Sequence, residues 1–383
     1  MRIASIVFKV KRCLTRYLGL GPWRIASFDS IAGQRTTYAD GVHRPEDFTG
    51  VIFANSFQPT YFSQEKSLIG QCPEPEVVAE GTRYVEKGLY PASPVRVYSL
   101  SEAGAISSDG VVYCLKTRRA VAESFRSWEI SIKDHPALVS PRYPSAARLP
   151  GLTLSLLTLS GEGFYHYLLE SIPRLCLLRP WLKLADHVLS AGSANSIQTR
   201  WLEYAGVPLE KVVWMNGLCH VTCDQLLFTD YPMRDQLPSE WIVEAIRSSF
   251  PSPRHKSFAT GRRIWISRGD ATSRILHWED DLLALLPEFS RIHLAELTPA
   301  EQISLAANAE VVAGPHGAGF SNMVFGQHKA KVIELFPVHH YKPVYGRLAS
   351  VVGLSYTWAM VDFQYPPPDL HDLAQAVRSF CDS

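Results

Sequence analysis

The stretch of sequence that most constrains the fold runs from residue 262 to residue 337. Short apolar runs rich in β-branched residues alternate there with segments whose apolar residues recur at helical spacing. Strands are expected at 262–267, 291–294, 310–313 and 331–336, and helices at 278–286, 298–308 and 320–325. This alternation is typical of a parallel, doubly wound sheet, so the predicted fold class is α/β.

A glycine-rich loop, Gly314-Pro315-His316-Gly317-Ala318-Gly319, follows the third expected strand and precedes a helix. Glycines there let a ligand approach the backbone closely, and N–H groups at a helix start favour an anion such as a diphosphate. The spacing is neither the G-x-G-x-x-G of a dinucleotide site nor a P-loop. The sequence therefore predicts a phosphate-binding loop that contains a histidine.

Two arginines lie close to the end of the first expected strand. Arg268 and Arg274 flank the loop that leaves it, directly after Ser267. Guanidinium groups bind phosphate oxygens through paired hydrogen bonds, and ligands of such sheets bind at the carboxyl ends of the strands. We expect Arg268 to bind phosphate, with Arg274 as a helper. A structural ion pair is the alternative for Arg268, and a buried core histidine is the alternative for His316.

The strings Ile266-Ser267-Arg268, EVVAGPHGAGFSNMVF (310–325) and VIELFP (332–337) together resemble glycosyltransferase family 61, with a weaker match upstream at 164–178. That family includes bacterial capsule and lipopolysaccharide transferases, plant xylan-decorating enzymes and animal protein O-glycosyltransferases. The resemblance implies a GT-B fold, in which two Rossmann-like domains face a cleft. It also implies a nucleotide-sugar donor and inversion at the anomeric carbon without a bound metal or other cofactor.

The resemblance implies a donor site made of residues in the C-terminal part of the chain. These residues are Ser267, Arg268, Arg274, Gly314, His316, Gly317, Ala318, Gly319 and Glu334. Glu334 is a charged residue in an apolar strand and needs a partner. Either a ribose hydroxyl, as the resemblance implies, or a structural salt bridge could supply that partner.

An inverting transfer also needs a base that takes the proton of the acceptor hydroxyl. Glu162, His166 and Glu170 are the candidates. His166 and Glu170 are four residues apart on an expected helix at 164–178, which places a base beside an orienting carboxylate. We expect these two to be catalytic. The alternative is that Glu170 is structural and His166 only lines the cleft. Pro173 is expected to kink or shorten the helix.

Composition narrows the possible partners. A net charge of +1 argues against nucleic acid as a generic partner. The seven cysteines are scattered, which favours a reduced, cytoplasmic protein without a zinc site; the pair Cys219 and Cys223 lacks further ligands at zinc-site spacing. No Asp-x-Asp occurs, which is consistent with metal independence.

The chain is expected to divide into three parts. Residues 1–24 form a basic amphipathic helix, for which an anionic membrane surface and the protein itself are equally open as partners. Residues 25–250 form an acceptor-side domain, with a β-rich lead-in at 25–150 and an α/β unit at 151–250. Residues 251–383 form the nucleotide-sugar-binding domain. The sequence contains no long uncharged apolar stretch, so no transmembrane helix is predicted.

The predicted function is an inverting, metal-independent glycosyltransferase that moves a sugar from a nucleotide-sugar to a glycan. Bacterial capsule or lipopolysaccharide synthesis is the expected setting, with a lipid-linked acceptor and the enzyme cytoplasmic or peripheral at the inner membrane. Two alternatives stay open: a nucleotide-sugar-binding protein without transfer activity, and an epimerase or dehydrogenase. The missing dinucleotide fingerprint argues against the last.

Overall fold

The computed structural model describes residues 24–26, 50–55, 60–62, 88–90, 95–126, 132, 135–140, 142–233, 238–251 and 262–383. Contacts divide the chain into two compact units: unit 1 comprises Met1–Phe57 and Ser93–Pro232, and unit 2 comprises Gln58–Ala92 and Met233–Ser383. Residues 1–23 of the expected helix at 1–24 lie outside the described residues, and Arg24 begins the strand β1.

Unit 1 is built on a nine-stranded mixed sheet with the order β1-β7-β6-β5-β11-β8-β9-β10, to which β2 adds beside β5. The strands are β1 (Arg24–Ala26), β2 (Gly50–Asn55), β5 (Val95–Ile106), β6 (Val111–Cys114), β7 (Arg119–Val121), β8 (Ala147–Ser155), β9 (His187–Ala191), β10 (Val212–Met215) and β11 (His220–Thr229). β8 lies parallel to both β11 and β9, and β9 lies parallel to β10. This end of the sheet is the predicted α/β unit.

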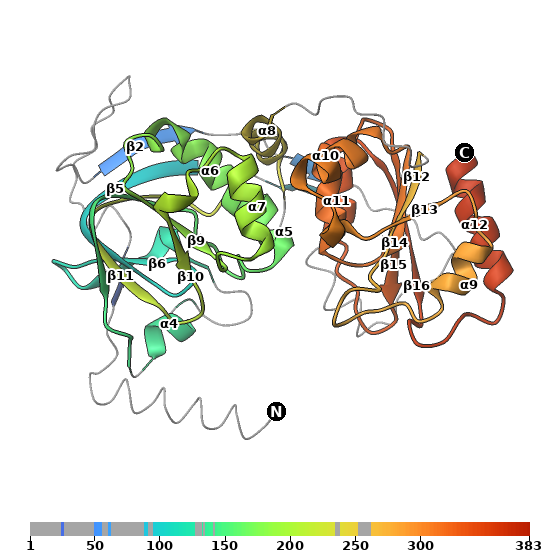
Figure 1. The fold of residues 1–383 in the computed structure, drawn as a ribbon, viewed down its shortest axis with the longest axis horizontal. Helices are drawn as coiled ribbons and strands as arrows, with labels where there is room; N and C mark the ends of the chain where they lie inside the picture. Colours follow the sequence, from blue (N-terminus) through green and yellow to red (C-terminus); the bar gives the residue numbers. More distant parts are fainter. Residues whose placement is uncertain are drawn as a thin grey trace. The chain divides into compact units, whose positions relative to one another are not determined.

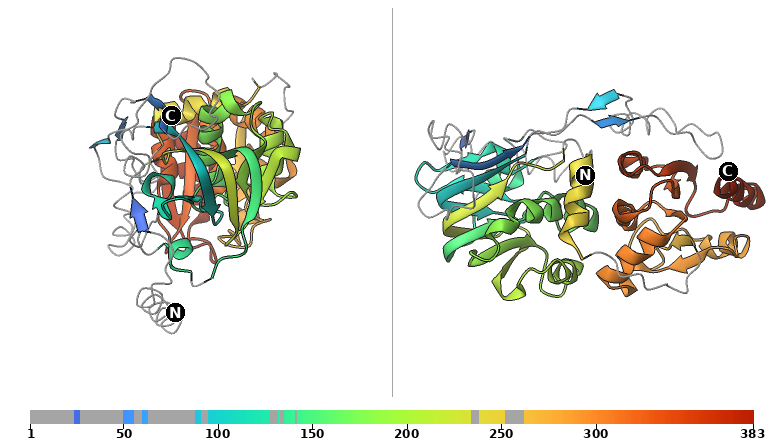
Figure 2. Two further views of the ribbon diagram at one scale, coloured as in Figure 1. Left: turned by 90° about the vertical axis from the view of Figure 1, so that its left-hand side faces the viewer. Right: turned by 90° about the horizontal axis from the view of Figure 1, so that it is seen from above.

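Helices of unit 1 connect the parallel strands, and α6 and α7 lie on one face of the sheet (Figures 1 and 2). The helical segments are α4 (Pro136–Val139), α5 (Phe164–His166), a π-helical turn (Tyr167–Ser171), α6 (Ile172–Leu178), α7 (Ile197–Tyr204) and 3-10 turns at Ala122–Ser124, Arg179–Trp181 and Leu209–Lys211. The expected lead-in strands belong to the same sheet as the α/β strands, because β5 pairs with β11 from Val97 to Ile106.

Unit 2 contains a five-stranded sheet with the order β13-β12-β14-β15-β16, in which every pairing is parallel. Its strands are β12 (Arg263–Ile266), β13 (Ser290–Ile292), β14 (Val311–Pro315), β15 (Lys331–Pro337) and β16 (Ser355–Val361). A small antiparallel ladder, β3 (Thr60–Phe62) with β4 (Gly88–Tyr90), groups with this unit. Numbered in chain order, the five-stranded sheet reads 2-1-3-4-5, which is the flavodoxin-like doubly wound order.

Helices cover both faces of the unit 2 sheet, with α10 and α11 on one side and α9 and α12 on the other (Figure 1). Their bounds are α8 (Glu240–Ser249), α9 (Glu279–Ala284), α10 (Pro299–Asn308), α11 (Val344–Val352) and α12 (Leu370–Asp382), with 3-10 segments at Leu294–Glu296 and Ala318–Phe325 (η8). The predicted start of α10 is confirmed, since Thr298 and Glu301 form a reciprocal capping box.

Three features of unit 2 differ from expectation. The segment after the glycine loop is a 3-10 helix instead of an α-helix, and its last carbonyls are bound by Arg247, through Nε to Val324 O at 2.7 Å and Nη2 to Gly326 O at 2.8 Å. The expected domain boundary at 250 differs from the contact division, because α8 packs against η8 and α11 of unit 2. Finally, α11 and β16 were not predicted.

Over the described residues, no helix combines the length and the apolar character that crossing a membrane would need.

Candidate functional site

The strand order of unit 2 places the glycine loop and the arginines together. β12 and β14 are neighbours, but the chain leaves β12 toward β13 on one side and reaches β14 on the other. This is the point where the strand order reverses, and ligands of open α/β sheets bind there, at the carboxyl ends of the strands. Arg268 follows β12 and His316 follows β14.

A cavity of about 110 Å³ lies at this position. It is lined by Ile266, Ser267, Arg268, Asp270, Ala271, Leu294, Ala295, Pro315, Gly317 and Gly319. Pockets for drug-sized ligands measure roughly 300–1,000 Å³, so the cavity offers room for a phosphate group instead of a whole nucleotide. The predicted loop residues Gly317 and Gly319 thus share one hollow with Arg268.

Arg268 has unused hydrogen-bonding capacity beside this cavity. Its Nη2 donates to the carbonyl of Ser273 at 2.9 Å, while its buried Nε has no hydrogen-bond partner. Burial lowers the pKa of this guanidinium, and the neighbouring Arg274 lowers it further. A desolvated cation with unpaired donors is suited to an anion that also supplies charge.

Two glycines have separate structural reasons. Gly314 lies inside β14 with φ +153°, and a Cβ there would lie 2.5 Å from the carbonyl oxygen of Ile266. It therefore permits close packing of β14 on β12 beneath the cavity. A Cβ at Gly317 would instead overlap Nη1 of Arg268, so Gly317 leaves the space that this side chain occupies.

His316 and Glu334 form a buried pair under the loop. Nδ1 of His316 is hydrogen-bonded to Oε1 of Glu334, and Oε2 of Glu334 accepts from the Tyr356 hydroxyl at 2.5 Å. The imidazole also stacks on Phe336, with ring centroids 5.0 Å apart. Glu334 has no exposed surface, and these two contacts are its partners within the fold. Its expected contact with a donor ribose stays a prediction.

Burial favours the neutral form of both members of this pair. Burial raises the pKa of Glu334 well above its ordinary value, with Tyr356 and Arg274 acting in the opposite direction. Burial also lowers the pKa of His316 well below its ordinary value, and the positive charges of Arg274, Arg268 and Lys342 lower it further. An imidazole surrounded by three cations can donate a hydrogen bond to an anion without carrying a charge of its own.

Arg274 and Ser267 have partners within the fold. Nη1 of Arg274 lies 3.3 Å from Nε2 of His340, on the segment that follows β15. The Ser267 hydroxyl donates to Oε2 of Glu279 at 2.5 Å, which ties the start of α9 to β12. The single hydroxyl proton of Ser267 is thereby used, so its predicted role in donor binding is limited to lining the cavity.

The base candidates lie in unit 1, on the helix that follows β8. The helix is continuous from residue 164 to 178, but it widens into a π-helical turn over Tyr167–Ser171. Ile172 N–H donates to the carbonyl of Tyr167, five residues earlier. Pro173 has no N–H and its ring clashes with the carbonyl four residues before it, which explains the widened turn. The predicted irregularity at Pro173 takes this form.

The π-helical turn still places His166 and Glu170 on one face. Nδ1 of His166 lies 3.4 Å from Oε1 of Glu170, whose other oxygen accepts from the hydroxyl of Thr158. The Glu170 side chain is 1% exposed and that of His166 is 14% exposed. Catalytic hydrogen bonds are often long in unliganded proteins, so this pair has the arrangement of a base with its orienting carboxylate.

Glu162, the third candidate, is exposed and makes its hydrogen bonds to a different set of residues. Its Oε1 accepts from Gly217 N–H at 3.4 Å, and its backbone carbonyl accepts from the amide of Gln198 at 2.8 Å. The structure therefore brings together His166 and Glu170, but records no hydrogen bond between Glu162 and either of them in the described part of unit 1.

Several neighbours of these sites were missed by the sequence reasoning. His340 and Lys342 follow β15 at the carboxyl edge of the sheet, so the rule that selected Arg268 could also have selected them. Tyr356, Thr158 and Tyr231 are uncharged and carry no local motif. Within the described ranges, no group of three or more His, Cys, Asp or Glu residues is placed to hold a metal ion.

The match to known proteins includes residues of both candidate sites. A family model described as Glycosyltransferase 61 matches residues 164–333, a range that begins at α5 and ends in β15. The chain is also 28% identical over 139 residues to the EGF domain-specific O-linked N-acetylglucosamine transferase of Drosophila melanogaster, covering 35% of this chain. It spans about a quarter of that relative, 26% of its length. Residues 164–333 of this chain are therefore similar to glycosyltransferase family 61.

Proposed function

We propose that this protein is an inverting glycosyltransferase that transfers a sugar from a nucleotide diphosphate-sugar to a hydroxyl group of a glycan. The observation that carries the proposal is the switch-point cavity of unit 2, which is lined by Arg268 and by Pro315, Gly317 and Gly319 of the glycine loop. The buried His316–Glu334 pair adjoins these loop residues in the chain. The family match and the transferase relative support the same reaction class.

The reaction assigns a role to each group. His166 takes the proton of the acceptor hydroxyl, whose oxygen attacks the anomeric carbon from the face opposite the leaving group. The bond from that carbon to the diphosphate oxygen breaks, and the electron pair leaves with the nucleoside diphosphate. Arg268, Arg274 and the N–H of His316 stabilise the negative charge that develops there. Because these groups are cationic or neutral donors, we propose a transfer that needs no metal ion.

A GT-B type of division follows from this assignment, with the base on unit 1 and the donor nucleotide on unit 2. Loss of His166 should therefore abolish transfer and leave nucleotide binding intact. Loss of Arg268 should weaken nucleotide binding. If His166→Gln weakened nucleotide binding as much as Arg268→Ala does, this division would be wrong.

The first experiment is a thermal-shift screen of UDP-, GDP-, CMP- and TDP-sugars, with and without EDTA. A ligand that binds the folded state stabilises it by mass action and so raises Tm. At a hundredfold excess over Kd, the free energy of unfolding increases by about 2.7 kcal/mol. We expect one nucleotide class to raise Tm in EDTA, and Arg268→Ala to lose the shift. Arg262→Ala is the matched control, because Arg262 is exposed and pairs with Glu310.

Transfer itself is tested by following labelled sugar from the donor found in the screen. Anomeric NMR signals of the product then distinguish inversion from retention. Nucleotide binding without transfer or donor hydrolysis would favour a binding protein, and a Tm shift that vanishes in EDTA would refute metal independence.

The acceptor is the finer part of the proposal. The basic amphipathic pattern of residues 1–24 supports an acceptor held at an anionic membrane surface, as in capsule or lipopolysaccharide synthesis at the cytoplasmic face of a bacterial inner membrane. Flotation with vesicles of phosphatidylglycerol compares the full chain with residues 25–383. Equal failure of both proteins to float would refute the proposed binding to an anionic membrane surface.

A further inference from the structure

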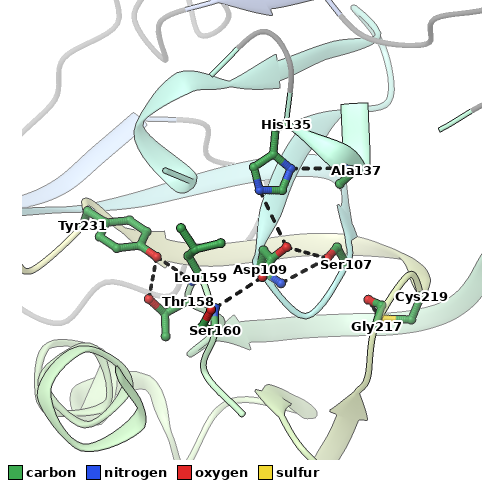
Figure 3. A network of polar contacts seen from close by, with 10 residues as sticks. All are labelled: Ser107, Asp109, His135, Ala137, Thr158, Leu159, Ser160, Gly217, Cys219 and Tyr231. Atoms are coloured by element: carbon green, nitrogen blue, oxygen red, sulfur yellow. Dashed lines mark hydrogen bonds and ion pairs between the residues drawn. The ribbon is translucent and has the colours of Figure 1, made fainter. Parts of the chain in front are cut away.

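A chain of hydroxyl groups lies beneath the His166–Glu170 pair. Tyr231, directly after β11, places its phenol oxygen 2.7 Å from Thr158 Oγ1 and 2.5 Å from the backbone N of Leu159 (Figure 3). Thr158 in turn bonds to Oε2 of Glu170. The phenol and both hydroxyl contacts are buried, and they connect the end of β11, the loop after β8 and the π-helical turn.

Counting protons gives this chain a direction. The N–H of Leu159 can only donate, so the Tyr231 oxygen accepts there. The Thr158 hydroxyl lies within hydrogen-bond distance of both Glu170 Oε2 and the Tyr231 oxygen, and it has a single proton. If Glu170 is a carboxylate, that proton goes to Oε2, and Thr158 then accepts from Tyr231. Each group therefore donates toward Glu170, whose second oxygen faces Nδ1 of His166 at 3.4 Å.

A buried positive charge lies close to Glu170 at the end of the chain. Arg174 is 2% exposed, lies one helical turn beyond Glu170, and stacks over the Tyr231 ring at 4.7 Å. Its Nε and Nη2 make no hydrogen bond, so its charge is not neutralised by direct pairing through them. Burial raises the pKa of Tyr231, which keeps the phenol protonated and able to donate.

The loop that carries Thr158 is held from the other side as well. Asp109 accepts from the N–H of Ser160 at 3.3 Å and from the hydroxyl of Ser107 at 3.1 Å, and it lies 3.7 Å from the buried His135 (Figure 3). Ser160 has a positive φ of 57°, an uncommon conformation for serine. The position of the Thr158 hydroxyl is thus fixed by contacts on both sides of the loop.

We propose that Thr158 and Tyr231 are positioning residues that keep Glu170 as a carboxylate acceptor and thereby hold His166 with its proton on Nδ1. The lone pair of His166 then lies on Nε2, the nitrogen that acts as base. The catalytic part of this inference rests on the proposed function, whereas the protonation state of His166 in the resting protein does not.

The decisive experiment reads the tautomer directly. Two-bond ¹H–¹⁵N correlation spectra of protein labelled at histidine distinguish Nδ1–H from Nε2–H, and the His166→Gln spectrum identifies the His166 signals. At a pH where His166 is neutral, we expect Nδ1–H in the wild type and a shift toward Nε2–H in Thr158→Val and Tyr231→Phe. Thr158→Ser, which keeps the hydroxyl, should restore the wild-type pattern.

Kinetics give the second arm. Loss of a hydrogen bond to a charged group corresponds to about a 10- to 100-fold decrease, which we expect in kcat with acceptor KM unchanged. The acidic limb of the pH profile of kcat should shift as well. Tyr143→Phe is the matched control, because it removes a half-buried phenol oxygen that bonds the carbonyl of Ala137 in the same unit.

The outcomes separate the two proposals. Nε2–H on His166 in the wild type, or an unchanged tautomer in Thr158→Val, would overturn the positioning role. Nδ1–H in the wild type that is lost in both variants would support it, even if no sugar donor were ever transferred. In that case the transferase proposal alone would fail.

Discussion

Each unit contains a histidine whose Nδ1 bonds to a buried glutamate, but the two pairs lie in different surroundings. In unit 1 the carboxylate of Glu170 accepts from Thr158, and the His166 side chain is 14% exposed. In unit 2 the His316 side chain is 7% exposed and lies among Arg268, Arg274 and Lys342. The same two residue types can therefore serve different chemistry.

The proton between each pair is expected to sit on opposite partners. At Glu170, the proposed positioning role has Thr158 donating to one oxygen and Nδ1 of His166 donating to the other, which leaves Nε2 basic. Around Glu334, burial raises the carboxyl pKa, so the acid donates to Nδ1 of His316 and Nε2 carries hydrogen. One histidine is then a base for a hydroxyl, and the other is a hydrogen-bond donor for a phosphate. The protonation of each glutamate then determines the role of its histidine.

The largest effect should separate the two histidines. We expect His166→Gln to lower kcat by about 10²- to 10⁴-fold, since general bases contribute that much, with nucleotide Kd unchanged. His316→Gln should mainly raise nucleotide Kd, measured by calorimetry. His371→Gln, on the exposed face of α12, serves as the control. If both variants changed the same parameter, the difference between the pairs would not be functional.

Two substitutions in the glycine loop test how the surroundings of the His316–Glu334 pair contribute to stability and to nucleotide binding. Gly314→Ala should destabilise the fold by about 2–5 kcal/mol, because its backbone is strained for alanine and its Cβ meets a carbonyl. Gly317→Ala displaces only the flexible end of Arg268, so we expect it to weaken nucleotide binding about 10- to 100-fold with little loss of stability. Urea unfolding and calorimetry measure the two effects, and an unfolded Gly317→Ala would contradict this distinction.

The pH dependence of stability reports the proton on Glu334. Its raised pKa means that the folded protein keeps a proton that the unfolded chain releases above the ordinary value of 4.5. This contribution is complete below pH 4.5 and declines as the pH rises toward the folded pKa. His316, with its lowered pKa, contributes stability that is complete above 6.5 and is lost as the pH falls.

We therefore expect the free energy of unfolding of the wild type, relative to Glu334→Gln, to decline from pH 4.5 upward. The slope can reach about 1.4 kcal/mol per pH unit for one proton. Above pH 6.5 the histidine no longer opposes it. Urea titrations at pH 5 to 9 provide the data, with Ser350→Ala as a non-titrating control in unit 2. If this difference in the free energy of unfolding rose with pH, the proton of the pair would lie on His316 instead of Glu334.

The smallest expected effect compares the tyrosines that support the two glutamates. Tyr356→Phe removes the hydrogen bond to Glu334 and should cost about 1 kcal/mol of stability, with little change in kcat. Tyr231→Phe should instead act on kcat. Differential scanning calorimetry and transfer assays decide between them, and a larger kcat loss for Tyr356→Phe would reverse the roles assigned to the two pairs.

The sequence reasoning succeeded where the chain is locally periodic. The strands and helices from 262 to 337 were predicted because parallel strands are buried apolar runs, and the capping box of α10 is a local signal. The hairpin-rich start of unit 1 was only partly predicted: β5 extends to Ile106 and β11 begins at His220, well beyond their apolar centres. Their length depends on pairing between strands more than 100 residues apart, which no local pattern contains.

The candidate sites were predictable for charged and glycine residues, since these stand out in apolar surroundings. Their supports were not. Tyr356 reaches Glu334 only because β15 and β16 pair in register, with Glu334 beside Trp358. Tyr231 reaches Thr158 across 73 positions of sequence. Likewise, Arg247 binds the carbonyl of Val324 in the 3-10 helix η8 from 77 positions away in the sequence.

Pro173 has a consequence for how this protein compares with its relatives. A π-helical turn holds one residue more than an α-helical turn, so it behaves as a single-residue insertion hidden inside a helix. Relatives that lack a proline at this position can close the same helix with one residue fewer. Their chains should then align with a one-residue gap between His166 and Arg174, although both ends of the helix occupy the same places. A gap of this kind would leave the histidine in the same place and change only the spacing of the residues that follow it.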